Sequence, residues 1–215
     1  MVNLSNKVDK FNEQGYIHLK NVIEPTLLAH TRFRAITLKN KYKEFEGHKR
    51  SNGSGTFWKQ LEMASTLDPL LYQSYTDKNM LEIAKTFLQV EEPYLFNDQV
   101  VVKLPNEEFS FDPHFDNQYG KDPEAALRGD FKTINCCQIL TNMPKETGPL
   151  RCKNLKTNRW NLLPAQAGDI IIIDGNTLHS STVNTSTKIR ALYACVYSTH
   201  PIGNFAKGYY NEKFK

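Results

Sequence analysis

Three residues in the second half of the chain have the side chains and the spacing of a metal site. His114 and Asp116 lie two positions apart, so both side chains face the same side of an extended segment, and His179 follows a strongly apolar stretch. Two imidazoles and one carboxylate form the facial triad of non-haem iron(II) sites, which leaves positions open for a cosubstrate and dioxygen. A short HxD pattern also arises by chance, and residues that merely flank a loop are the alternative interpretation.

A lone arginine in an apolar strand gives the second chemical signal. Arg190 follows His179 by 11 residues and shares one face of a predicted strand with three apolar side chains. A buried guanidinium is unfavourable unless a carboxylate pairs with it, and a bidentate pair removes that cost. The carboxylate can belong to a bound ligand, or to Asp169 or Asp174 of this chain, and the residue pattern leaves both possibilities open.

The elements that must position these residues fall into two groups. Apolar residues at helical spacing predict helices over 25–45 and 80–88, and Gly15 closes a short helix before them. Segments rich in Val, Ile, Tyr, Phe and Thr predict strands over 94–104, 131–141, 169–174 and 189–199. Helices followed by strands favour an α+β domain, with the helices packed on one face of an antiparallel sheet or barrel. We expect a single domain over 1–215, helix-rich over 1–92, with a β core over about 93–200.

Two segments have compositions that are typical of loops. The glycine- and serine-rich stretch 47–55 predicts a mobile loop, which could close as a lid over a bound substrate. The tail 207–215 mixes lysines with aromatic residues, and its composition does not define how it packs.

Composition excludes several other classes of protein. Lys plus Arg is 27 against 23 for Asp plus Glu, a net charge of +4 that is too small and too dispersed to predict nucleic-acid binding. No stretch approaches the roughly 20 apolar residues of a membrane helix, and the first residues lack the apolar core of a secretory signal. The 4 cysteines fit neither a zinc site nor a disulfide framework. We therefore expect a cytoplasmic protein with no nucleic-acid and no membrane partner.

The motifs of the β-rich half, taken together, resemble those of a known enzyme family. HxD, then Gly-Asp with an apolar strand, then H-x-S-x-x-N-x-S-x-x-x-R is similar to the pattern of the phytanoyl-CoA dioxygenase-like family of iron(II)- and 2-oxoglutarate-dependent oxygenases. The matching residues are His114, Asp116, Gly168, Asp169, His179, Ser181, Asn184, Ser186 and Arg190. The Gly148-Pro149-Leu150 turn adds to the resemblance, which is dense from 103 to 190.

The resemblance implies a fold and a role for each matching residue. The fold is a double-stranded β-helix, the jelly-roll core of cupin-like proteins. His114, Asp116 and His179 would be the catalytic ligands of iron(II). Arg190 would bind the distal carboxylate of 2-oxoglutarate, with the hydroxyl group of Ser181 assisting.

Polar residues on the strand upstream of the triad are weaker candidates for contacts with the cosubstrate. Asn97, Gln99 and Lys103 alternate onto one face of the predicted strand, where members of the family often place a polar residue or a lysine. A half-exposed strand whose polar side chains face water is an equally good interpretation of each of them.

The reaction implied by the resemblance is the hydroxylation of a C–H bond in a small molecule, with consumption of O2 and release of succinate and CO2. The loops around the motifs are shorter than in larger members, which argues against a bulky acyl-CoA and favours a small substrate such as an amino acid or a derivative. Desaturation or cyclisation at the same site is one alternative, and a non-catalytic metal-binding jelly-roll protein is another. Asp116 disfavours halogenation, which needs a small residue in place of the carboxylate. The oligomeric state is not predicted.

Overall fold

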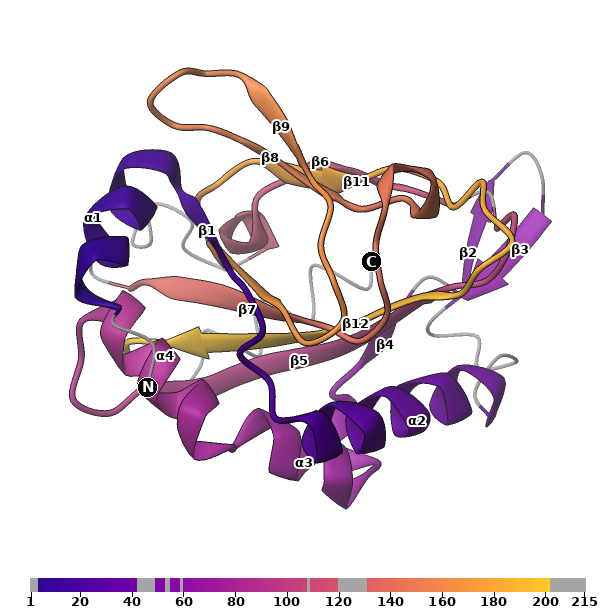
Figure 1. Cartoon of the computed structure of the whole chain (residues 1–215), viewed down its shortest axis with the longest axis horizontal. Helices are drawn as coiled ribbons and strands as arrows, with labels where there is room; N and C mark the ends of the chain where they lie inside the picture. Colours follow the sequence, from indigo (N-terminus) through magenta and orange to yellow (C-terminus); the bar gives the residue numbers. More distant parts are fainter. Residues whose placement is uncertain are drawn as a thin grey trace.

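Two facing antiparallel sheets form the frame of the molecule (Figure 1). The structure, a computed structural model, describes residues 4–41, 49–52, 55–58, 60–107, 109–119 and 131–201. The strands of the larger sheet lie in the order β1 (Tyr16–Leu19), β10 (Ile170–Asp174), β7 (Thr133–Ile139), β12 (Arg190–Ser198), β5 (Tyr94–Lys103) and β4 (Leu61–Glu62). Those of the smaller sheet lie in the order β6 (Phe111–His114), β11 (His179–Ser181), β8 (Leu150–Lys153) and β9 (Trp160–Leu163).

The chain passes back and forth between the two sheets as it runs from β5 to β12. Every strand pairing within the two sheets is antiparallel. This arrangement is the double-stranded β-helix of the jelly-roll fold, so the predicted α+β class and core are confirmed.

The central strands of the larger sheet are buried on both faces. All residues of β7 and β12 are buried, as expected of strands that are covered on two sides. Alternate side chains therefore supply two separate cores, one between the sheet and the helices and one between the two sheets. The neighbouring cysteines illustrate this alternation, because Cys136 belongs to the first core and Cys137 to the second. A site between the sheets must be built from side chains of this second face.

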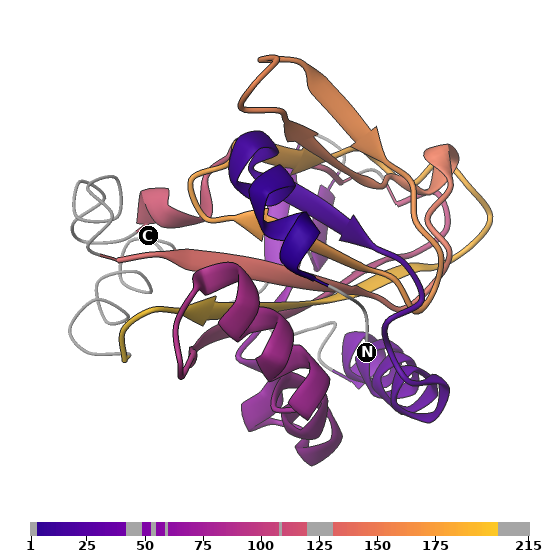
Figure 2. The same cartoon turned by 60° about the vertical axis from the view of Figure 1, so that its left-hand side comes forward.

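Helices cover the opposite face of the larger sheet. Helices α2 (Pro25–Lys41), α3 (Pro69–Tyr75) and α4 (Lys78–Leu88) lie on the side of this sheet away from the smaller one (Figures 1 and 2). Helix α1 (Ser5–Gln14) lies beside β1 and ends at Gly15, whose φ of 80° is the left-handed conformation that the sequence predicted there. No helix in these described segments is long and apolar enough to cross a membrane.

The predicted helices agree with the structure, and one short helix was not predicted. Helix α4 begins after Asp77, whose carboxylate accepts hydrogen bonds from the first backbone N–H groups of the helix. The predicted helix 25–45 is confirmed to Lys41, and its residues 42–45 lie outside the described part of the chain. Helix α3 was missed because its 7 residues are too few to show a helical period.

The segment 47–55 differs from its prediction as a mobile loop. Strand β2 (Lys49–Asn52) pairs with β3 (Gly55–Trp58), so the described part of this segment belongs to a β-hairpin. Asn and Gly, which indicated a loop, are also the residues that tight hairpin turns favour. Residues 47, 48, 53 and 54 lie outside the described chain, and the suggested role as a lid stays a prediction.

One buried tyrosine supports an irregularity in the largest strand pair. The pairing of β12 with β5 shifts register between Val196 and Tyr197, which leaves backbone groups without ladder partners. The hydroxyl group of Tyr75, on α3, donates toward the carbonyl groups of Asn97 (2.9 Å) and Val196, and accepts from the N–H of Phe96 (3.0 Å). This single hydroxyl group therefore satisfies the polar groups that the bulge exposes inside the core.

Replacing Tyr75 with phenylalanine should destabilise the fold. The variant keeps the ring but leaves the buried N–H of Phe96 without its acceptor, so we expect the free energy of unfolding to fall by about 1–3 kcal/mol in urea denaturation. Tyr72→Phe is the matched control, because Tyr72 lies on the same helix with 53% of its surface exposed. Equal stability of Tyr75→Phe and the unmodified protein would show that the bulge does not need this hydroxyl group.

Candidate active site

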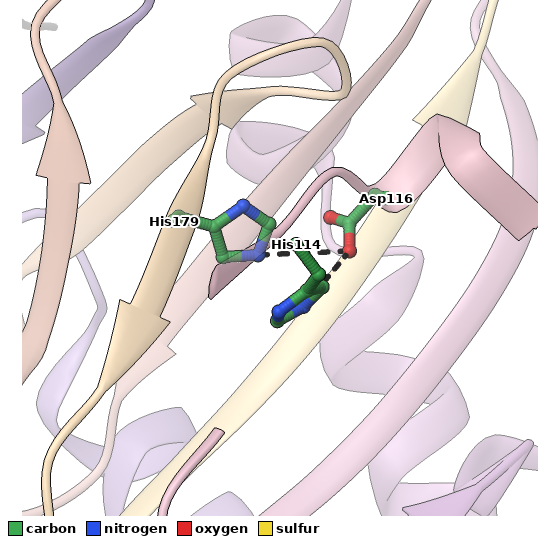
Figure 3. A group of neighbouring side chains, drawn as sticks. All are labelled: His114, Asp116 and His179. Carbon is green, nitrogen blue, oxygen red and sulfur yellow. Dashed lines mark ion pairs between the residues drawn. The ribbon is translucent and has the colours of Figure 1, made fainter. Parts of the chain in front are cut away.

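The three predicted metal ligands lie together between the two sheets. His114 ends β6, His179 begins β11, and the pairing of these two strands places the histidines opposite each other. The Oδ1 atom of Asp116 lies 3.8 Å from Nε2 of His114 and 3.6 Å from Nε2 of His179 (Figure 3). All three ligand atoms lie within 4.8 Å of one another. Ligand atoms that bind one ion at about 2.1 Å each lie about 3–4 Å apart, so the two distances from Asp116 to the histidines fit a single metal ion.

Backbone carbonyl groups fix the proton positions on both imidazoles. Nδ1 of His114 lies 2.7 Å from the carbonyl oxygen of Asp112, and Nδ1 of His179 lies 2.9 Å from that of Thr177. A carbonyl oxygen can only accept a hydrogen bond, so each Nδ1 carries the proton and donates it. Nε2 of each ring is therefore unprotonated in the neutral imidazole and directed at Asp116, as a metal ligand must be.

A bulge and a turn bring His114 and Asp116 into position. Between the paired residues His179 and Ser181 of β11, strand β6 advances by three residues, so Phe111 and His114 both face the space between the sheets. Asp116 does not continue the strand, as the i, i+2 argument had predicted, but begins a 3-10 turn, Asp116–Tyr119. The N–H of Asn117 donates to the carbonyl of Gly175, the residue that follows β10 of the larger sheet. This hydrogen bond holds the turn in place.

A cavity extends from the triad along the face of the larger sheet. It is lined by apolar side chains from both sheets, by the triad and by a few polar residues: Gln99, Asn135, Ser180, Ser181 and Arg190. Among the described residues that line it, Arg190 alone carries a permanent positive charge.

The guanidinium group of Arg190 is buried and has no partner in the described structure. Its side chain is 1% exposed, and none of its three nitrogen atoms makes a hydrogen bond. Burial lowers the pKa of this arginine to about 10, so it is still charged at neutral pH. An unpaired charge in the interior is unfavourable, and a carboxylate entering the cavity would compensate it.

The two internal carboxylates that could have neutralised Arg190 are engaged elsewhere. Asp169 lies 2.8 Å from Nε2 of His18 and accepts a hydrogen bond from the N–H of Asn21. Asp174 accepts from the N–H of Asn176 at 2.8 Å. The alternative of an internal salt bridge for Arg190 is therefore wrong.

Lys103 lies next to Arg190 in the sheet and holds Ser181. The two residues are paired across β5 and β12, and Lys103 is fully buried. Its Nζ atom donates to Oγ of Ser181 at 2.9 Å and to the carbonyl of Thr182, and it lies 5.1 Å from the ring centre of Phe109. Because Ser181 accepts from Lys103, its own hydroxyl proton is available to a group in the cavity.

The other two candidates on β5 are placed differently from each other. Gln99 lines the cavity, and its side-chain amide has no hydrogen-bond partner among the described residues. Asn97 is not among the lining residues, and its Nδ2 atom donates to Oε2 of Glu62 at 3.0 Å. The structure thus brings Gln99, but not Asn97, to the predicted site.

Two polar residues of the sequence motif shape the chain before Arg190. The amide of Asn184 donates to the carbonyl groups of Leu104 (2.9 Å) and Lys188 (2.8 Å) and accepts from the hydroxyl of Ser186 (2.7 Å). These bonds close the turn that leads from β11 into β12. The N-x-S part of the motif therefore positions Arg190 without lining the cavity.

Sequence reasoning missed Asn135, which is bonded to a member of the triad. Its Nδ2 atom donates to Oδ2 of Asp116 at 3.1 Å. The available signal was the alternation of β7, which places Asn135 on the same face as Cys137, a residue that also lines the cavity.

Comparison with solved structures agrees with this fold. Solved structures similar to this chain include the non-heme alpha-ketoglutarate-dependent epimerase SnoN from nogalamycin biosynthesis, at 19% identity and a TM-score of 0.74, with 90% of this chain and 81% of that chain covered. EctD from S. alaskensis is similar at 16% identity and a TM-score of 0.75, with 90% of this chain and 76% of that chain covered. The carbocyclase SnoK matches at 20% identity and a TM-score of 0.74, with coverages of 91% and 84%. No curated protein sequence matches this chain.

Fold and site together define a jelly-roll protein with two histidines and a carboxylate set for one metal ion. The model of the phytanoyl-CoA dioxygenase (PhyH) family matches residues 11–192 of the 215. The chain therefore belongs to this family, as its motifs predicted.

Replacing Arg190 with methionine should stabilise the protein in the absence of metal and cosubstrate. The change removes an uncompensated buried charge and keeps most of the side-chain volume, so we expect about 2 kcal/mol more stability and a melting temperature higher by about 4–8 °C. Differential scanning calorimetry in a buffer without carboxylates measures this. Arg159→Met, at an exposed site, should change little. A lower melting temperature for Arg190→Met would mean that its charge is already compensated.

Proposed function

We propose that this protein is an iron(II)- and 2-oxoglutarate-dependent oxygenase that hydroxylates a C–H bond of a small molecule. The observation that supports this most directly is the unpaired guanidinium of Arg190, buried in the cavity that also contains the two histidines and the carboxylate. A metal triad alone would fit many reactions. A triad with an unneutralised buried cation in the same cavity favours an anionic cosubstrate that spans both.

The residues of the site fit iron(II) and 2-oxoglutarate. The metal would be held by Nε2 of His114, Nε2 of His179 and Oδ1 of Asp116, because these three atoms converge. The other polar atom of each side chain, Nδ1 of the histidines and Oδ2 of the aspartate, is hydrogen bonded to a different group. When bound, iron(II) with 2-oxoglutarate and O2 supplies the oxidising power to break a C–H bond, with succinate and CO2 as coproducts.

The chain itself would bind the cosubstrate and keep water out. Arg190 would pair with the distal carboxylate, and the hydroxyl of Ser181, held by Lys103, would donate to the same group. Val101, Leu150 and Leu192 form apolar walls of the cavity, which suit the methylene groups of 2-oxoglutarate and exclude solvent.

The substrate is proposed to be a small molecule, with an amino acid or a derivative as the specific suggestion. Gln99 supports this, because its amide faces the cavity without a partner and can bond to a polar group of a compact substrate. Similar solved structures contain nogalamycin RO and 5-hydroxyectoine, both small molecules. A cytoplasmic location stays a prediction, as does the single domain over 1–215.

Desaturation or cyclisation at the same site is the second candidate, and the similar structures, which include a carbocyclase and an epimerase, add epimerisation to the reactions to be separated. The mass of the product separates the reactions. Hydroxylation adds one oxygen atom, desaturation or cyclisation removes two hydrogen atoms, and epimerisation leaves the mass unchanged. A non-catalytic metal-binding protein would release no succinate.

Calorimetric titration of 2-oxoglutarate into the anaerobic, iron(II)-loaded protein tests the proposal. We expect a dissociation constant in the micromolar range, similar to typical Michaelis constants. Arg190→Met should weaken binding by about 30-fold or more, because it removes a charge-assisted contact in a buried site. His179→Ala should abolish binding by removing a metal ligand.

The controls separate this site from general anion binding. Arg159→Met removes an exposed arginine outside the cavity and should bind 2-oxoglutarate like the unmodified protein. Succinate release in the presence of O2 then establishes turnover. Absence of binding to the unmodified iron(II) protein would contradict the oxygenase assignment and favour the metal-binding protein without catalysis.

A further inference from the structure

We propose that Asn135 is a positioning residue that keeps Asp116 a ligand through one oxygen atom only. This inference rests on the proposed metal site. It concerns how many coordination positions that site leaves open, which the identity of the three ligands does not determine.

The two oxygen atoms of the Asp116 carboxylate have different surroundings. Oδ1 faces the imidazoles, 3.8 Å from His114 and 3.6 Å from His179. Oδ2 accepts a hydrogen bond of 3.1 Å from Nδ2 of Asn135. The carboxylate is therefore oriented with one oxygen toward the metal position and the other toward the larger sheet.

Asn135 is well placed to hold that orientation. It lies in β7, a central strand hydrogen bonded to β10 and β12, where it is paired with Ile173 and Val196, and it is 7% exposed. Its two neighbours determine that Nδ2 of the amide faces Asp116 and that Oδ1 faces Cys137. The carboxylate of Asp116 needs a donor, and the Sγ atom of Cys137, 3.4 Å from Oδ1 of Asn135, can donate to that oxygen.

The backbone at Asp116 is held by other groups, so Asn135 acts on the side chain. Asn117 donates its N–H to the carbonyl of Gly175 at 3.1 Å, and its Oδ1 atom accepts from the hydroxyl of Thr133 at 2.7 Å. Loss of the Asn135 amide would leave these bonds in place. Oδ2 would lose its hydrogen bond to Asn135, and rotation of the carboxylate about its terminal torsion, which is soft, would become easier.

This orientation has a chemical consequence. A carboxylate can bind a metal ion through one oxygen or through both. Three protein ligand atoms leave three of six octahedral positions open, enough for a chelating cosubstrate and O2. A second oxygen from Asp116 would occupy one of them. By holding Oδ2, Asn135 preserves the open position.

The test uses Co(II) under anaerobic conditions, because its visible absorption reports the number and geometry of its ligands without turnover. For Asn135→Leu we expect Co(II) affinity to change by about 10–100-fold, the usual effect of losing a partner of a metal ligand. The visible bands should shift in position or intensity, and the spectral change on adding 2-oxoglutarate should need at least about 10-fold more cosubstrate. Cys136→Ala is the matched control, since Cys136 is buried on the same strand but faces the helices.

The outcomes are distinct. A Co(II) spectrum, Co(II) affinity and 2-oxoglutarate response equal to those of the unmodified protein would overturn the role of Asn135. Asn135→Ala is used in the same way if Asn135→Leu does not fold by circular dichroism. Failure of the unmodified protein to bind Co(II) at all would instead contradict the proposed metal site, and the proposal for Asn135 with it.

Discussion

The arrangement of the site depends on one electrostatic constraint, a positive charge buried without a partner. Arg190 is the first residue of β12, the strand that lies between β7 and β5 in the larger sheet, and it is 1% exposed. Burying such a charge is unfavourable in free energy. The surrounding fold must therefore hold the side chain in place, and a bound carboxylate must compensate the lost hydration. The turn built by Asn184, the paired strand with Lys103 and the apolar walls together hold it there.

The site needs both sheets, and this explains why a jelly roll suits it. The smaller sheet supplies His114, His179 and Ser181, whereas the larger sheet supplies Arg190 and Asn135. Strands buried on both faces provide rigid supports, and the helices shield the opposite face of the larger sheet. Bound groups between the sheets would therefore meet fixed partners, with little reorganisation when they enter.

Much of this could be predicted from the sequence, and the failures have physical causes. Four strands of the larger sheet, β5, β7, β10 and β12, were predicted because burial on both faces produces apolar runs, and α4 was predicted because its apolar stripe is long. The 7-residue α3 has too little periodicity, and the paired strands β2 and β3 include Asn52 and Gly55, residue types that also indicate a loop. The triad and Arg190 belong to a motif, whereas Asn135 is a single polar residue, 19 positions from its partner Asp116. Only the three-dimensional arrangement reveals that contact, and it also shows that Asn97 bonds to Glu62 outside the cavity.

The most direct test of the proposed site is a crystal structure of the protein grown anaerobically with Mn(II) and 2-oxoglutarate. We expect one metal ion bound by Nε2 of both histidines and by a single oxygen of Asp116, and a carboxylate of 2-oxoglutarate paired with Arg190. Density for 2-oxoglutarate elsewhere, or Arg190 still unpaired beside an occupied metal, would contradict it.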